Sequence, residues 1–253
     1  RRPRMGARTG NQAPESIPRM NDLSAAWTTA LRLIAALDSE LIDIVLLSMK
    51  VSVTAVVLAL FAGLPLGAAL AVGRFPGRKA VMVALNALMG LPPVVVGLLV
   101  YLLLSRAGPL GELGLLFTPG AMVVAQTVLV APIIAALSRQ VLEDAWREYE
   151  EQLRSLGAGP FRGAVTLLWD VRFSLVTIVL AGFGRAAAEV GAVMIVGGNI
   201  DGVTRVMTTT IALETSKGDL PLALGLGIIL VGIVLGVNAL AQLVKDAALR
   251  RYG

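Results

Sequence analysis

Two residues of opposite charge, Arg185 and Glu189, stand four positions apart inside the otherwise uncharged run 173–200. On a helix this spacing brings the two side chains together, so each can neutralise the other. A charged side chain inside a bilayer is costly and is typical of ion pathways. Two interpretations remain open: a salt bridge that locks helices together, or an arginine that attracts a passing anion while the glutamate prevents permanent capture.

A pair of prolines, Pro92 and Pro93, stands near the centre of the uncharged run 80–105. Two prolines remove two amide donors and kink or break a helix. Irregular backbone at membrane depth is tolerated where it is buried or lines a cavity. The pattern is compatible with a packing kink and with a break that faces a pore, which would place Asn86 along the path. Gln126 is compatible with either an interhelical hydrogen bond or a pore-lining position.

The residue types that the chain lacks exclude several kinds of chemistry. Its 253 residues include no Cys and no His, which removes disulfides, thiolate nucleophiles, imidazole bases and the usual zinc ligands. No GxxxxGK[ST] phosphate-binding loop occurs, so ATP hydrolysis by this chain is not expected. We therefore predict no catalytic residue, metal site or cofactor in this chain. The net charge of +5 is what basic loops beside membrane spans produce, so nucleic acid is not an expected partner.

The elements that carry these residues are predicted to be membrane-spanning helices. Hydrophobic residues make up 56% of the chain, and long runs without any charge recur. About 20 apolar residues cross a hydrocarbon core of roughly 30 Å, and helices satisfy their own backbone groups in lipid. We therefore predict an all-α integral membrane protein whose membrane domain, 41–245, lies in the lipid bilayer. Its five predicted spans are 41–73, 80–105, 113–138, 172–200 and 220–245.

Lysine and arginine predict the orientation of these spans, because cytoplasmic loops carry an excess of them. Eleven lie between spans one and two, between spans three and four, or after span five, against three on the other side. We therefore expect a cytoplasmic tail at 246–253 and an outward amino terminus. The arginine-rich segment 1–40 does not follow this rule. It is expected to be a tail or an over-extended start without a secretory signal, and its apolar spacing over 23–37 is compatible with an amphipathic helix in the outer interface.

The longest charged stretch in the body of the chain, 142–170, falls between spans three and four. Helix formers fill 144–156, and the following Gly157 and Pro160 predict a helix stop and a restart. On the second helix, apolar residues recur at i, i+3, i+4 and i+7. These residues are Phe161, Ala164, Val165 and Leu168. Such a stripe is compatible with a helix that inserts into a groove of another protein, and equally with one that lies on the inner leaflet.

The same stretch resembles the EAA loop of ABC importer permeases. The family pattern is Glu-Ala-Ala, three residues, Gly, nine residues and Ile-x-Leu-Pro. Here Glu151 is followed by Gln and Leu, Gly157 stands at the glycine position, and 167–170 read Leu-Leu-Trp-Asp. Gln and Leu thus replace the two alanines, and Trp and Asp replace the final Leu and Pro. The segments 183–192 and 194–224 are similar to the molybdate, sulfate and tungstate group of these permeases, and most of all to its tungstate branch.

The resemblance implies the type I ABC importer permease architecture, with five transmembrane helices and a cytoplasmic coupling helix between helices three and four. A separate ATPase subunit, which would hold ATP and Mg²⁺, is implied to dock on this coupling segment. The residues implied to make that contact are Glu151, Gly157, Phe161, Val165 and Leu168. The other implied partners are an extracytoplasmic oxyanion-binding protein and a second copy of this chain. The implied location is the bacterial inner membrane.

The implied function is that of a permease subunit, without an ATPase site of its own, that translocates a tetrahedral oxyanion. Tungstate is the expected substrate, with molybdate or sulfate as the alternative. The residues expected along the path are Arg185 first, then Glu189, Asn86, Pro92, Pro93 and Gln126. A membrane assembly protein is a remote alternative, because it does not need an intramembrane ion pair, a double-proline break and an amphipathic cytoplasmic helix–turn–helix together. A membrane-embedded enzyme is less compatible still, since no His or Cys accompanies the intramembrane pair.

Overall fold

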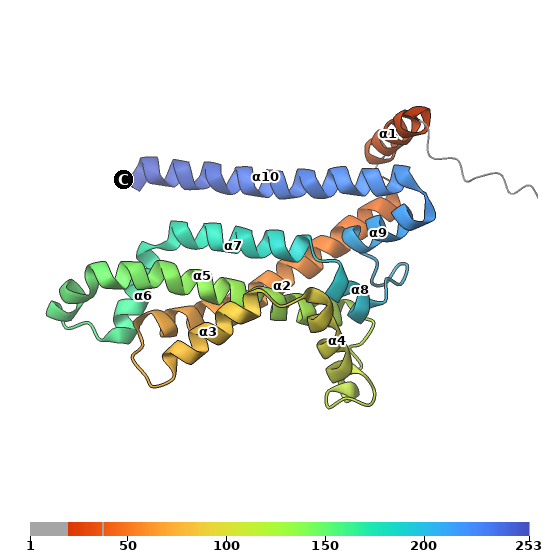
Figure 1. Ribbon diagram of the computed structural model, residues 1–253. Helices are drawn as coiled ribbons and strands as arrows, with labels where there is room; N and C mark the ends of the chain where they lie inside the picture. The colour runs from red at the N-terminus through yellow and green to blue at the C-terminus, as the bar shows by residue number, and fades with distance from the viewer. Residues whose placement is uncertain (1–19, 37, 253) are drawn as a thin grey trace, which may run out of the picture.

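The computed structural model describes residues 20–36 and 38–252, and in this part of the chain every regular element is a helix (Figure 1). The predicted all-α class is therefore confirmed. The tail 1–19 and residues 37 and 253 lie outside the described residues. In chain order the elements are α1 (Met20–Ala35), α2 (Ser39–Val72), α3 (Arg78–Met89), α4 (Pro93–Leu104), the 3₁₀ turn η1 (Gly111–Leu113), α5 (Pro119–Ser155), α6 (Pro160–Asp170), α7 (Arg172–Ala187), α8 (Gly191–Gly197), α9 (Met207–Lys217) and α10 (Leu220–Tyr252).

Three helices are long and apolar enough to cross a membrane, namely α2, α5 and residues 220–247 of α10. Two further pairs meet the same criteria together but are sharply bent, α3 with α4 by 103° and α6 with α7 by 77°. If each bent pair is one span, the described residues hold up to five spans. This range includes the number expected from the apolar runs.

The contact between α2 and α5 is made possible by two glycines. Gly63 and Gly67 stand four residues apart on α2, so they form one face of small residues. A Cβ atom at Gly63 would lie 2.7 Å from the carbonyl oxygen of Ala131, and one at Gly67 would lie 2.7 Å from that of Ala135. These distances leave no room for a methyl group, so the backbones of the two helices pack directly against each other.

α5 continues well beyond the predicted span 113–138. It runs for 37 residues as one helix, from Pro119 to Ser155. The residues after Ser138 are helix formers, and several form ion pairs with neighbours four positions away, so nothing stops the helix where the charged stretch begins. The helix ends at the predicted place, because Gly157 adopts a φ of +75° and closes a Schellman motif on the last turn.

The predicted span 172–200 consists of two helices, α7 and α8, separated by residues 188–190. The expectation of one continuous element is therefore corrected. Glu189 stabilises the break, because its Oε1 accepts the Ala192 N–H at 3.0 Å and so occupies a donor that α8 itself cannot satisfy. The break carries no proline and lies inside a long run whose other residues are mostly apolar, so a search for spans by apolar length does not reveal it.

The two ends of the helix bundle gather different segments (Figure 1). α6, the loop before α3 and the carboxyl end of α10 lie at one end, which we call the elbow end. α1, α8 and α9 lie at the opposite end. The three basic segments that predicted the cytoplasmic side therefore all gather at the elbow end.

α1 packs against α10 through small residues. Ala26 and Ala30 are buried, and Gly225 of α10 faces Ala30. Trp27 and Leu31 stay exposed on α1. Most of the amphipathic segment predicted at 23–37 thus belongs to α1, whereas its residue 37 lies outside the described residues.

Candidate functional site

The elbow between α5 and α6 presents an exposed apolar face. α6 buries Gly163, Ala164 and Leu167. The packing is close, because a Cβ at Gly163 would lie 2.5 Å from the ring of Trp146 on α5. The exposed apolar residues of the elbow are Leu156, Phe161, Val165 and Trp169, which we call the elbow surface. Phe161 is 81% exposed and Trp169 is 73% exposed, so large apolar side chains at this end have no cover within the described chain.

The fold divides the predicted apolar stripe of α6 between two environments. Phe161 and Val165 lie on the elbow surface, whereas Ala164 is buried and Leu168 is half-buried. Trp169 is absent from the predicted stripe, although its spacing of four and eight residues from the two exposed members is a usable signal.

The remaining residues of the predicted docking segment lie around the turn between the two helices. Glu151 is exposed near the end of α5, and Gly157 forms the turn itself. Leu156 is also exposed there but belongs to no periodic pattern, so the sequence offers no signal for it.

One arginine braces the 77° bend between α6 and α7. Arg172 Nη1 donates a hydrogen bond of 2.7 Å to the carbonyl oxygen of Trp169. The same guanidinium lies 4.9 Å from the centre of the Trp169 ring and 4.6 Å from that of Phe173, within cation–π range. The bend and the orientation of Trp169 are therefore stabilised by one side chain.

Two helix breaks meet where α4 packs against α8. α3 bends by 103° before α4 begins, and residues 188–190 separate α7 from α8. A Cβ at Gly191 would lie 2.9 Å from Cγ2 of Val94, so the first turns of α4 and α8 are in direct contact. We call the two breaks with these first turns, residues 90–94 and 188–192, the break junction.

The predicted ion pair is present at this junction, and its two members differ in exposure. Arg185 Nη2 lies 3.5 Å from Glu189 Oε2, and the two side chains are 38% and 3% exposed. Glu189 makes further contacts, since its Oε1 accepts the Ala192 N–H at 3.0 Å and its backbone carbonyl accepts the Thr208 hydroxyl at 2.8 Å. The carboxylate is thus committed to the protein interior, whereas part of the guanidinium remains accessible.

The other path candidates differ in how far they are buried in the protein. Gln126 is buried and its Nε2 donates to the Ala186 carbonyl at 3.0 Å, so the interhelical hydrogen bond that the sequence left open is present. Its Oε1 has no partner in the described part of the chain, and the residue lines a cavity of about 10 Å³, room for one water molecule. Asn86 is exposed on α3, and Pro92 is exposed in the bend between α3 and α4. Pro93, the first residue of α4, is half-buried. The two prolines therefore accompany a break rather than a mild kink.

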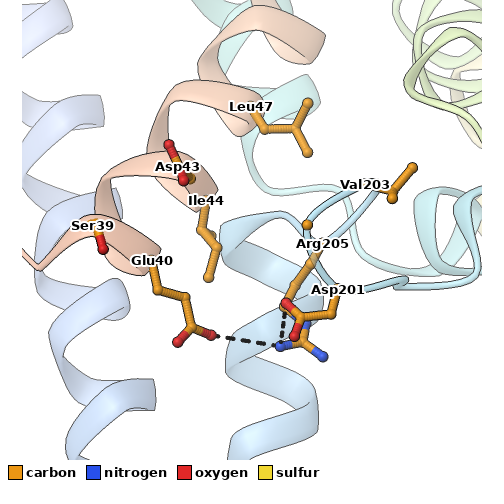
Figure 2. Close-up of a pocket in the computed structure, with 9 residues that line it drawn as sticks. Ser39, Glu40, Asp43, Ile44, Leu47, Asp201, Val203 and Arg205 are labelled. Atoms are coloured by element: carbon orange, nitrogen blue, oxygen red, sulfur yellow. Dashed lines mark ion pairs between the residues drawn. The ribbon is translucent and has the colours of Figure 1, made fainter.

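A pocket of about 680 Å³ opens at the end opposite the elbow, between the start of α2 and the loop before α9 (Figure 2). Its charged side chains are Glu40, Asp43, Asp201 and Arg205. Arg205 Nη1 lies 3.0 Å from Asp201 and 3.7 Å from Glu40, and Asp43 stands apart from these two ion pairs (Figure 2). The pocket is negative overall. Within the described residues, no group of three or more acidic side chains has a geometry that could hold a metal ion.

Several known proteins are similar to this chain over most of its length. The tungstate uptake system permease protein TupB of Peptoclostridium acidaminophilum is 39% identical over 227 residues, which are 90% of this chain and 100% of that protein. The protein of the same name from Campylobacter jejuni is 36% identical over 172 residues, 68% of this chain and 72% of that protein. The molybdenum transport system permease protein ModB of Escherichia coli K12 is 33% identical over 186 residues, 69% of this chain and 81% of that protein.

A family model described as "Binding-protein-dependent transport system inner membrane component" matches residues 63–253. This stretch contains the break junction, the elbow surface and residues 63–72 of α2 with its two glycines. Because the match covers well over half of the 253 residues, this chain belongs to the family of binding-protein-dependent transport system inner membrane components.

Proposed function

We propose that this chain is the pore-forming subunit of an ATP-driven importer, and that it translocates tungstate. Tungstate is preferred because two similar proteins, 39% and 36% identical to this chain, are named tungstate uptake permeases. Molybdate is the alternative, supported by the 33% identity to a permease named for molybdenum transport. Sulfate is a further alternative, since a sulfate transport permease of Synechocystis is 29% identical over 185 residues. All three substrates are tetrahedral dianions.

The observation that carries the proposal is the elbow surface. Large apolar side chains stand exposed on a short helix, and this helix follows directly from the charged extension of α5, beyond the apolar part of that helix. An amphipathic helix of this kind suits a hydrophobic groove on a partner protein. The partner that fits is an ATPase subunit, which would supply the ATP and Mg²⁺ for which this chain has no phosphate-binding loop.

The path is proposed to run along the break junction, between two copies of this chain. Irregular backbone at membrane depth is tolerated where it lines a cavity, and two such breaks meet here. Arg185 offers an accessible positive charge to the dianion, and Glu189 limits how tightly the anion is held. Asn86 lies exposed on α3, and Pro92 lies exposed in the bend between α3 and α4. Gln126 stabilises the end of α7 by donating a hydrogen bond to the Ala186 carbonyl oxygen.

The elbow end is proposed to face the cytoplasm, because the three basic segments gather there. The amino terminus then lies outside and the tail 246–253 inside. The opposite end, with its 680 Å³ pocket, becomes the surface that receives the extracytoplasmic binding protein. In this arrangement the binding protein delivers the anion at one end of the bundle, while the ATPase acts at the other.

The test is ATP-dependent uptake of tungstate, molybdate and sulfate into vesicles that contain this chain, its ATPase and its binding protein. Tungstate is expected to be taken up fastest, and uptake is expected to stop when ATP is replaced by a non-hydrolysable analogue. Vesicles without the binding protein serve as the control. Faster uptake of molybdate or sulfate would replace the substrate and keep the mechanism, whereas no uptake of any of the three would contradict the importer function.

A further inference from the structure

Glu143, on the charged extension of α5, is surrounded by three arginines. Its side chain is 16% exposed, and its Oε1 lies 3.0 Å from Arg147 Nη2 and 3.4 Å from Arg78 Nη2. Its Oε2 accepts a hydrogen bond from Arg139 Nη1. Two of these arginines belong to α5 itself, so their pairs with Glu143 hold a single helix together. Only Arg78 reaches Glu143 from another helix.

Arg78 joins three helices at the elbow end. It is the first residue of α3, and its Nη2 pairs with Glu143 on α5. Its Nε also donates a hydrogen bond of 2.7 Å to the carbonyl oxygen of Leu70, in the last turn of α2. A planar guanidinium can make both contacts at once, because its donors point in fixed and different directions. The ends of α2, α3 and α5 are therefore linked through one side chain.

The two helices joined by the Arg78–Glu143 pair lead to the elbow surface and to the break junction, the two functional regions of the proposed importer subunit. α5 runs without interruption into the turn before the elbow surface. α3 runs from Arg78 to the 103° bend at the break junction. A displacement of the elbow can therefore be passed to the bend through the start of α3, if that start moves together with the extension of α5, in addition to the direct packing of α5 against α4 and α8.

We propose that Arg78 and Glu143 are positioning residues that make α3 follow the elbow, so that ATP hydrolysis at the partner is coupled to movement at the break junction. This inference rests on the proposed function, because it requires an ATPase that acts at the elbow surface. Neither residue touches the transported anion in this proposal. Their role is to fix the start of α3 to α5 through the transport cycle.

The pair is better suited to this role than to holding the fold together. If Arg78 is lost, Glu143 keeps Arg139 and Arg147, so no buried carboxylate is left unpaired. Arg78 is itself 25% exposed, and ion pairs with partial access to solvent contribute little to stability. Its removal should therefore loosen the first turn of α3 from α5, while Leu85 of α3 stays packed against Ala135 and Ala136 of α5.

The test compares Arg78→Gln with the unaltered chain in the reconstituted importer, by measuring anion uptake per ATP hydrolysed. We expect this ratio to fall by about two- to thirtyfold, the range of coupling changes produced by residues that touch neither ligand. The ATPase should still co-purify with the variant. Arg78→Lys should recover most of the ratio, because an ammonium keeps the charge pair between α3 and α5.

Arg154→Gln is the matched control. It also removes an arginine–glutamate pair, of 2.6 Å with Glu150, but both partners lie on α5. Its uptake per ATP should be unchanged. An unchanged ratio in Arg78→Gln would overturn the inference, and so would a loss of uptake, ATPase activity and folded yield in equal proportion.

A variant of the elbow surface separates this inference from the proposed function. Phe161→Asp should prevent co-purification of the ATPase, because it places a charge in the apolar contact. If Phe161→Asp keeps the ATPase bound and uptake unchanged, the proposed docking site is contradicted. If Phe161→Asp loses the ATPase while Arg78→Gln keeps a normal ratio, only the coupling role of Arg78 is contradicted.

Discussion

At the residue scale, the ion pair of the break junction assigns different tasks to its two members. Glu189 is buried and holds the first turn of α8 as well as Arg185. Arg185 has one described ion-pair partner and an accessible guanidinium. The two interpretations left open by the sequence therefore need not compete, because the structural contacts are concentrated on the carboxylate and the accessible charge on the arginine.

Arg185→Gln should slow uptake by about ten- to hundredfold, since a hydrogen bond to a charged group is worth roughly 1.5–3 kcal/mol. Folded yield should also fall, because the buried Glu189 carboxylate loses its counter-ion, but by less than uptake, because Glu189 Oε1 still accepts the Ala192 N–H. Uptake assays and yield after size-exclusion chromatography measure the two effects. Arg185→Lys, which keeps the charge, is the control. Equal losses of uptake and yield would mean that the arginine serves only the salt bridge.

The sequence predicts local contacts of this site and misses the distant ones. Arg185 and Glu189 could be paired from their spacing, because both lie one helical turn apart. The hydrogen bond from Gln126 to Ala186 joins residues 60 positions apart. That partner depends on how α5 packs against α7, and no periodicity encodes it.

At the element scale, glycine and proline marked the helix ends outside the apolar runs well. Gly157 and Pro160 end α5 and begin α6 where the sequence placed the stop and the restart. The break at 188–190 carries no proline, and a buried carboxylate stabilises it instead. A helix start that is stabilised by a side chain accepting one of its first amide donors is hard to recognise before the fold is known.

Gly67→Ala should weaken the packing of α2 on α5. The added Cβ would lie 2.1 Å from Ser138 Oγ and 2.7 Å from the Ala135 carbonyl oxygen, so the helices must separate. We expect a loss of about 1–3 kcal/mol, typical of overpacking, seen as a lower thermal midpoint in detergent. Gly232→Ala on α10 is the control, since its Cβ would meet no atom within 4 Å. A midpoint unchanged in Gly67→Ala would show that the two helices can separate at no cost.

At the scale of the whole molecule, the basic segments and α6, which carries most of the elbow surface, share one end of the bundle (Figure 1). The acidic pocket lies at the other end, between the start of α2 and the loop before α9. This division could be anticipated, because successive spans return the chain to alternate sides. The packing of α1 on α10 could not be anticipated, since it depends on Ala30 meeting Gly225, about three quarters of the chain away. The sequence therefore predicted which loops share a side, but not which helices are neighbours.

Single cysteines test the orientation directly, because the natural chain has none. Ser155 and Ser216 are both exposed, and each donates to the carbonyl three residues before it, so Ser→Cys at these two positions forms a matched pair. In intact cells whose outer membrane has been removed, a membrane-impermeant maleimide should label the cysteine at 216 and not that at 155. Permeabilised cells, in which both should react, are the control. Labelling at 155 from outside would reverse the assigned orientation.

The glycine contact between α2 and α5 also has a consequence for biosynthesis. The ribosome completes α2 long before it reaches α5, with the bent pair α3 and α4 in between. Until α5 is inserted, the face of Gly63 and Gly67 meets lipid tails that cannot fill it as closely as a helix does. The early chain is therefore incomplete in the bilayer, and a stall in synthesis before α5 should leave a product open to membrane proteases.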